Sequence, residues 1–171
     1  MADAALEEQR LQSAAALKAQ KDILTQQLRD QRAEASRDRM IVAVTDMIAA
    51  VHQMSIEYRR DRETLLANYR QAYSAAHRWA IEDAGELDLI LLLAWPQWLY
   101  ELRMAADADH ENEAARNAAF DALQGASSRF QVLASQWPNA TGDQRKKIKD
   151  NLAGALLMRI ASSSKAAETP A

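Results

Sequence analysis

The side chains that commonly perform catalysis are few and scattered in this sequence. Its three histidines are His52, His77 and His110, and no two of them share the three- or four-residue spacing that places ligands on one helical face. Neither a Glu-x-x-His nor an HExxH motif occurs. The four glycines form no phosphate-binding loop, and no serine lies in a nucleophile elbow. We therefore expect a non-enzymatic protein without catalytic residues or cofactors.

One acidic run, DADHENE at residues 107–113, has the alternation of a calcium loop. Its carboxylates fall at every second position: Asp107, Asp109, Glu111 and Glu113. An EF-hand also needs glycine at loop position six and a bidentate glutamate at position twelve, where this chain has Asn112 and Ala118. Acidic residues are also favoured in the first turn of a helix by its dipole. We therefore predict a helix start and no metal site.

A basic run, RKKIK, lies near the end of the chain. Its charged members, which we predict to be exposed around a buried Ile148, are Arg145, Lys146, Lys147 and Lys149. Such a patch can meet phosphate, or an acidic protein surface such as residues 107–113. The chain as a whole has a net charge of −3, which does not favour nucleic acid. Nucleic-acid binding through these four residues is therefore an alternative function rather than the preferred one.

The elements that must position these residues are helices. Only four glycines and three prolines occur in 171 residues, and residues 1–84 contain neither type. Within this stretch residues 4–38 are polar, with Leu17, Leu24 and Leu28 at coiled-coil spacing and Lys21 at the seam position between them. These three leucines are candidate interaction residues. Residues 1–38 are either a solvated helical arm or a coiled coil that forms with a partner or a second copy.

The next stretch has a wider apolar face. Residues at alternating steps of four and three predict a helix facing a core: Met40, Val44, Met47, Val51, Met54 and Tyr58. The same face continues through Tyr69 and Tyr73 to Trp79, and Gly85 is expected to end the helix. The arginines among these tyrosines resemble a single-strand binding pattern, but Asp61 and Glu63 offset their charge.

The most apolar segment is LILLLAWPQWLYELR, residues 89–103. Its longest uninterrupted apolar run is seven residues, Leu89 to Trp95, whereas a membrane-spanning helix needs about 18. We predict the central core helix of a bundle, in which Pro96 either kinks the helix or begins a new one. Association of residues 89–100 with a membrane surface through Trp95, Trp98 and Tyr100 is a second alternative.

Two further helices follow. The first carries Phe120, Leu123, Phe130 and Trp137 on one face, and the second carries Ile148, Leu152, Leu156 and Ile160. Between them WPNATG, residues 137–142, reads as a loop, and Thr141 with Gln144 fits a capping box. The final SSSKAAETPA, residues 162–171, is typical of a disordered tail.

Together these patterns predict an all-α protein. We expect an antiparallel bundle of four to five helices over residues 39–161, an extended, coiled-coil-like arm over 1–38 and a tail over 162–171. The favoured function is that of a structural or interaction protein, a helical subunit or adaptor of a larger assembly that self-associates or binds a protein partner through its arm. By analogy of architecture alone, phage virions and secretion machines contain such subunits. The acidic N-terminus is not a signal peptide, so we expect a cytoplasmic protein or part of a particle assembled there.

Overall fold

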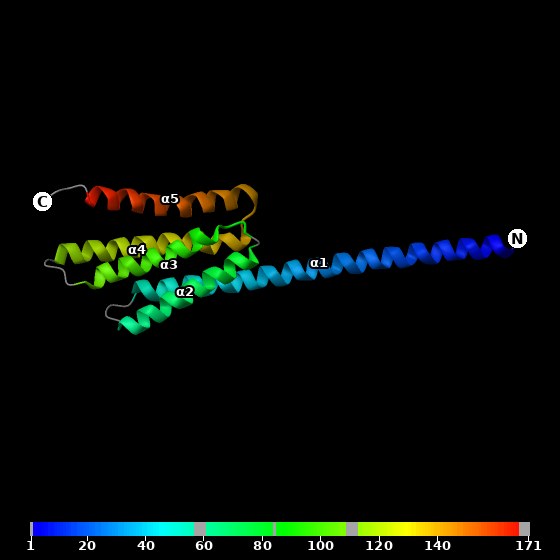
Figure 1. The fold of residues 1–171 in the computed structure, drawn as a ribbon, viewed down its shortest axis with the longest axis horizontal. Helices are drawn as coiled ribbons and strands as arrows, with labels where there is room; N and C mark the ends of the chain where they lie inside the picture. The colour runs from blue at the N-terminus through cyan, green and yellow to red at the C-terminus, as the bar shows by residue number, and fades with distance from the viewer. Residues whose placement is uncertain (1, 57–60, 84, 109–112, 168–171) are drawn as a thin grey trace. The chain divides into compact units, whose positions relative to one another are not determined.

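The described part of the chain is helical. The computed structural model describes residues 2–56, 61–83, 85–108 and 113–167, with side chains from residue 7 to residue 158 within these ranges. Its elements are five α-helices and one 3₁₀ turn: α1 (Ala2–Ile56), α2 (Arg62–Glu82), α3 (Leu89–Asp107), α4 (Glu113–Gln136), η1 (Trp137–Asn139) and α5 (Gly142–Ala167) (Figure 1). The described ranges contain no strand, so the all-α prediction is confirmed.

The chain divides into two compact units, Met1–Asp38 and Arg39–Ala171. The first unit, which we call the arm, is a single length of helix. From Glu7 to Asp38 every side chain is exposed except that of Ser36, which is half-buried. The arm therefore has no hydrophobic core of its own.

The second unit, which we call the body, is a helical bundle. Helices α2 to α5 are joined by short connections and run in alternating directions (Figure 1). α3 packs against both α2 and α4, and α5 packs on α4 and α3. Residues 39–56 of α1 supply the fifth helix of the body, because their apolar side chains belong to its core.

The core contains the apolar helix face predicted for residues 40–54. Its members are fully or nearly fully buried: Met40, Val44, Met47, Val51 and Met54. Large aromatic rings fill the space between the helices. Trp95 lies 5.3 Å from Phe130 between ring centroids, and Trp79 meets Trp137 edge-on at 6.3 Å. Met40, Met47 and Met54 are therefore core residues.

The apolar segment of α3 is only partly a core helix. Leu92, Trp95 and Leu99 are completely buried, as predicted, but Ile90 is 77% exposed. The helix continues through Pro96 to Asp107, so the proline does not begin a new helix. The helix starts where the Asp88 carboxylate accepts the backbone N–H of Ile90 at 2.9 Å.

The connections follow local capping chemistry. α2 ends at Glu82, and Gly85, with a φ of +81°, allows the chain to turn towards α3. The backbone N–H of Thr141 donates to the Gln144 side chain at 3.4 Å, which is one half of the predicted capping box.

α5 extends further than the sequence suggested. It reaches Ala167, whereas a disordered tail was predicted from residue 162; residues 168–171 lie outside the described ranges. Residues 155–169 contain no glycine or proline, so nothing in their composition terminates the helix earlier.

Truncating the most buried aromatic residue of α3 should destabilise the body. Trp95→Ala is expected to lower the free energy of unfolding by about 3–5 kcal/mol, because a cavity replaces a fully buried indole. Ile90→Ala, on the same helix but at the surface, should change it by less than about 0.5 kcal/mol. Urea denaturation followed by circular dichroism measures both variants, and equal effects would contradict the assignment of α3 as the central core helix.

Candidate functional site

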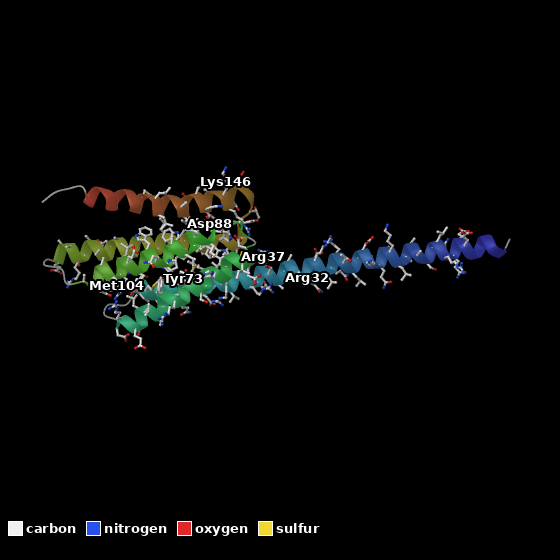
Figure 2. All side chains as sticks on the ribbon, in the orientation of Figure 1. Arg32, Arg37, Tyr73, Asp88, Met104 and Lys146 are labelled. Carbon is white, nitrogen blue, oxygen red and sulfur yellow. The ribbon has the colours of Figure 1, made fainter. Side chains whose placement is uncertain are left out.

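Three leucines of the arm form an exposed apolar stripe. Leu17, Leu24 and Leu28 are 67%, 52% and 53% exposed. At about 100° per residue, steps of seven and four keep them within about 20° of a common line along the helix. Leu11 and Ile23 are equally exposed, but they lie about a third of a turn away from that line. Figure 2 shows α1 with its side chains as sticks; Arg32 and Arg37, which are labelled, lie beyond the stripe in sequence.

The stripe has no packing partner within the arm. An isolated helix is marginally stable in water, and most helical stability in proteins comes from burying an apolar face. Polar residues surround the leucines and form local bonds, such as that from Gln26 to Asp30 at 2.8 Å. The three leucines of the stripe therefore remain exposed on the arm.

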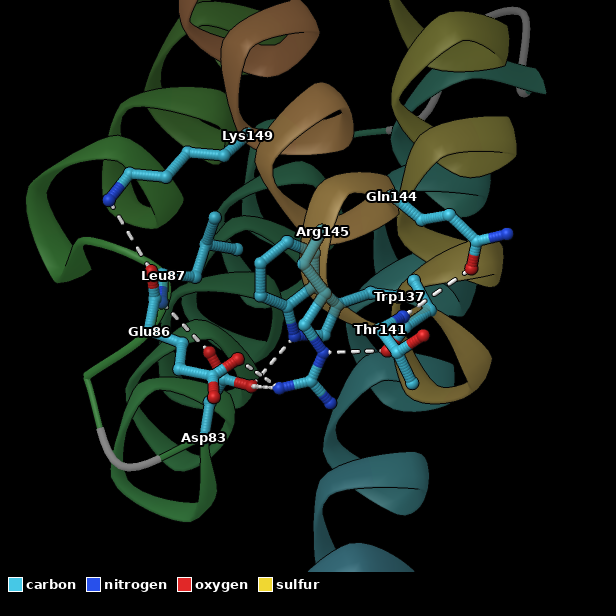
Figure 3. Close-up of polar contacts among 9 residues, drawn as sticks. Asp83, Glu86, Leu87, Trp137, Thr141, Gln144, Arg145 and Lys149 are labelled. Carbon is cyan, nitrogen blue, oxygen red and sulfur yellow. Dashed lines mark hydrogen bonds and ion pairs between the residues drawn. The ribbon is translucent and has the colours of Figure 1, made fainter.

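The four residues of the predicted basic patch do not form one exposed surface. Arg145 is partly buried: its Nε donates to the carbonyl of Ala140 at 2.8 Å, and its guanidinium lies over the Trp137 ring at 5.2 Å. Its Nη1 pairs with Glu86 and lies 3.6 Å from Asp83 (Figure 3). Arg145 thus connects the start of α5 to the α2–α3 connection. The basic end of the chain does attract acidic residues, but these are Asp83 and Glu86.

A buried carboxylate is at the centre of this contact. The Asp83 side chain is fully buried and accepts from Trp137 Nε1 at 2.7 Å and from the backbone N–H of Leu87 at 2.8 Å (Figure 3). Burial raises the pKa of Asp83, while the two hydrogen bonds and the charge of Arg145 act in the opposite direction. We call the four residues Asp83, Glu86, Trp137 and Arg145 the polar clasp.

The three lysines of the predicted patch differ in their surroundings. Lys149 is half-buried and donates to the carbonyl of Glu86 at 3.3 Å. Lys146 and Lys147 are exposed, and Lys147 lines an open hollow of about 550 Å³ beside α4, η1 and α5. Sequence spacing did not reveal this division, because the partners of Arg145 and Lys149 lie about sixty residues earlier in the chain.

A second exposed surface, which the sequence analysis missed, lies along α2. Tyr69, Tyr73, His77 and Ile81 follow one another at four-residue steps. Tyr73 stacks at 5.9 Å on Tyr69 and at 5.1 Å on His77, measured between ring centroids. The sequence placed Tyr73 on the core face, but it is 38% exposed, and Ile81 is 74% exposed. We call these four residues the α2 ridge.

Shallow hollows flank the α2 ridge. One of about 490 Å³ lies beside Tyr69, Tyr73 and His77, and another of about 280 Å³ is lined by Arg39, Val42, Arg78, Ile81 and Glu82. Ion pairs hold the rim of the smaller hollow: Arg39–Glu82 at 2.6 Å and Arg78–Asp46 at 2.8 Å. Exposed aromatic and apolar side chains beside fixed charges are typical of protein interfaces.

Among the residues that the structure describes, no three His, Asp or Glu side chains come together as metal ligands. Asp109, His110 and Glu111 lie outside these residues, so most of the predicted acidic run is not described. No helix in the described ranges is long and apolar enough to cross a membrane.

The polar clasp gives a pH-dependent prediction. Because the pKa of Asp83 is raised in the folded state, the protonated carboxyl group stabilises the fold. This stabilisation is complete below the pKa of an unfolded aspartate, about 3.9, and is lost as the pH rises through the pKa of the folded state. The free energy of unfolding of the unaltered chain minus that of Asp83→Asn should therefore fall as the pH rises above about 4. Urea titrations at several pH values measure this difference. A difference that rises with pH would mean that the hydrogen bonds and Arg145 outweigh burial.

Comparison with known proteins adds no family or relative to these observations: no family model, curated protein or solved structure matches the chain.

Proposed function

We propose that this protein is a non-enzymatic assembly protein, a helical subunit or adaptor of a larger complex. Its arm pairs with another helix, supplied by a second copy or by another subunit. Residues 39–161 form the folded body that the arm brings into the complex. The observation that carries this proposal is the stripe of Leu17, Leu24 and Leu28, more than half exposed on a helix without a core.

Burial of the leucine stripe is the favourable contribution to pairing. Full burial of a leucine side chain contributes about 1.5–3 kcal/mol, so covering the three stripe residues would offset the ordering of a second helix in part. Lys21 interrupts the seam, and polar residues at such positions reduce stability while fixing the register. The arm is therefore suited to reversible association.

The α2 ridge provides a second contact area on the body. Tyr73 and Ile81 are exposed, and Ile81 shares a hollow with the ion-paired Arg39, Arg78 and Glu82, an arrangement that suits docking of another protein more than a small substrate. A chain with one surface on the arm and another on the body has the layout of an adaptor.

Nucleic-acid binding is the alternative proposal. The observation in its favour is the exposure of Lys146 and Lys147 beside a hollow that also has the amide side chains of Gln136 and Asn139. It ranks second because Arg145 and Lys149 already have partners in the body. A gel shift at low salt that gives a complex sensitive to Lys146→Ala plus Lys147→Ala would support it.

Membrane-surface association through residues 89–100 ranks third. Of the three aromatic residues that would reach the lipid, Trp95 is completely buried, and Trp98 and Tyr100 are half-buried. Liposome flotation of the intact protein tests this proposal.

The proposal for the arm is tested by two matched double variants. Leu17→Glu plus Leu24→Glu should abolish association, because charges then occupy the seam of the pairing helix. Leu11→Glu plus Ile23→Glu places the same charges on the arm away from the stripe and should leave association intact. Light scattering over a range of concentrations measures molar mass, and affinity capture measures binding of other subunits. If the stripe variant matches the unaltered chain in both measurements, the proposal is wrong.

A further inference from the structure

We infer that the helix covering the stripe is the arm of a second copy, running antiparallel, with Gln26 of each chain at the midpoint of the overlap. This inference rests on the proposed function and names the partner that it leaves open.

The charges of the arm are compatible with a second copy. Residues 7–38 carry six basic and six acidic side chains, interspersed along the helix. Two identical arms therefore do not repel each other as a whole. In a two-fold symmetric dimer, each copy buries the stripe of the other, so no different protein is needed to cover it.

The orientation follows from the residues that share the seam with the leucines. In a heptad frame Leu17 and Leu24 occupy d positions and Leu28 an a position. The same frame places Lys21 at a and Arg10 at d. In a parallel, in-register pair each residue faces its own copy, so Lys21 would face Lys21 and Arg10 would face Arg10. Both pairs would bring like charges together at the interface between the two helices.

An antiparallel pair removes this repulsion, because a positions then face d positions of the other chain. With Gln26 at the midpoint, residues whose numbers add to 52 lie opposite one another. Leu24 then faces Leu28 of the other copy, and the reciprocal pair completes a central group of four leucines. Lys21 faces Gln31, whose amide oxygen accepts from an ammonium group, and the two Lys21 layers are separated by about 15 Å along the axis.

The outer layers of this register also fit by size. Leu17 faces Ala35, so that a large side chain packs against a small one in each outer layer. Lys18 and Arg32 come to the same edge of the pair, but both are long, exposed side chains whose repulsion in water is small. The register thus buries every leucine of the stripe without burying paired like charges.

Distance measurement between spin labels tests the orientation in the full-length protein. The sequence contains no cysteine, so a single introduced cysteine gives a single label in each chain. Gln12→Cys and Gln26→Cys both lie on the outer face of the helix, away from the seam. Antiparallel pairing places the two labels at residue 12 about 40 Å apart along the axis, whereas those at residue 26 lie at the same level on opposite sides of the pair. Parallel pairing places the two labels at the same level at both positions, so that the distance at residue 12 is as short as that at residue 26.

Disulfide formation provides a second readout. In the antiparallel register, Leu24→Cys and Leu28→Cys chains form a mixed disulfide when combined, and neither chain crosslinks with itself. Self-crosslinking of Leu24→Cys, or a short distance between labels at residue 12, would overturn the antiparallel orientation and leave the proposed function standing. An unaltered chain that stays monomeric at all concentrations would overturn this inference, while capture of another subunit through the stripe would still support the proposed function.

Discussion

The body depends on satisfying one buried carboxylate. Asp83 has no exposed side-chain surface, and a buried carboxylate without donors would be strongly destabilising. Each oxygen receives one donor, Trp137 Nε1 and the backbone N–H of Leu87, and Arg145 adds positive charge nearby. These donors come from η1, from the α2–α3 connection and from α5. A single side chain at the end of α2 therefore determines where three other segments of the body lie.

A second part of the body buries a cation, Arg103, whose Nη2 has no hydrogen-bond partner among the described residues. Arg103, of which only 2% is exposed, donates from Nε to Asp107 at 2.7 Å and reaches the carbonyl of Met54 with Nη1 at 3.5 Å. Gln124 donates to the carbonyl of Ser55 at 2.7 Å. The last carbonyls of α1 have no partners within the helix, and its dipole favours a cation at this end. Side chains of α3 and α4 thus complete the C-terminus of α1.

The helices could be predicted from the sequence more readily than the side-chain contacts between them. Helical periodicity identified the core face of residues 40–54, because five apolar positions repeat there at steps of four and three. It placed Tyr73 and Ile90 inside, yet both are exposed, since periodicity cannot tell which side of an apolar helix meets its neighbours. The role of Arg145 was equally hidden. A solvated helix face and an ion pair with Glu86 have the same local sequence, and only the fold brings residues 59 positions apart together.

α1 itself shows how one continuous helix can serve two purposes. Over residues 39–56 its apolar face is wide, with Ala43 and Ala50 beside the Met and Val stripe, and it is covered by the body's own helices. Over residues 7–38 the stripe narrows to single leucines, interrupted by Lys21. A wide face must be covered for the body to fold, whereas a narrow one can be covered or exposed without unfolding it. In the proposed assembly, folding of the body would therefore not require the stripe of the arm to be covered.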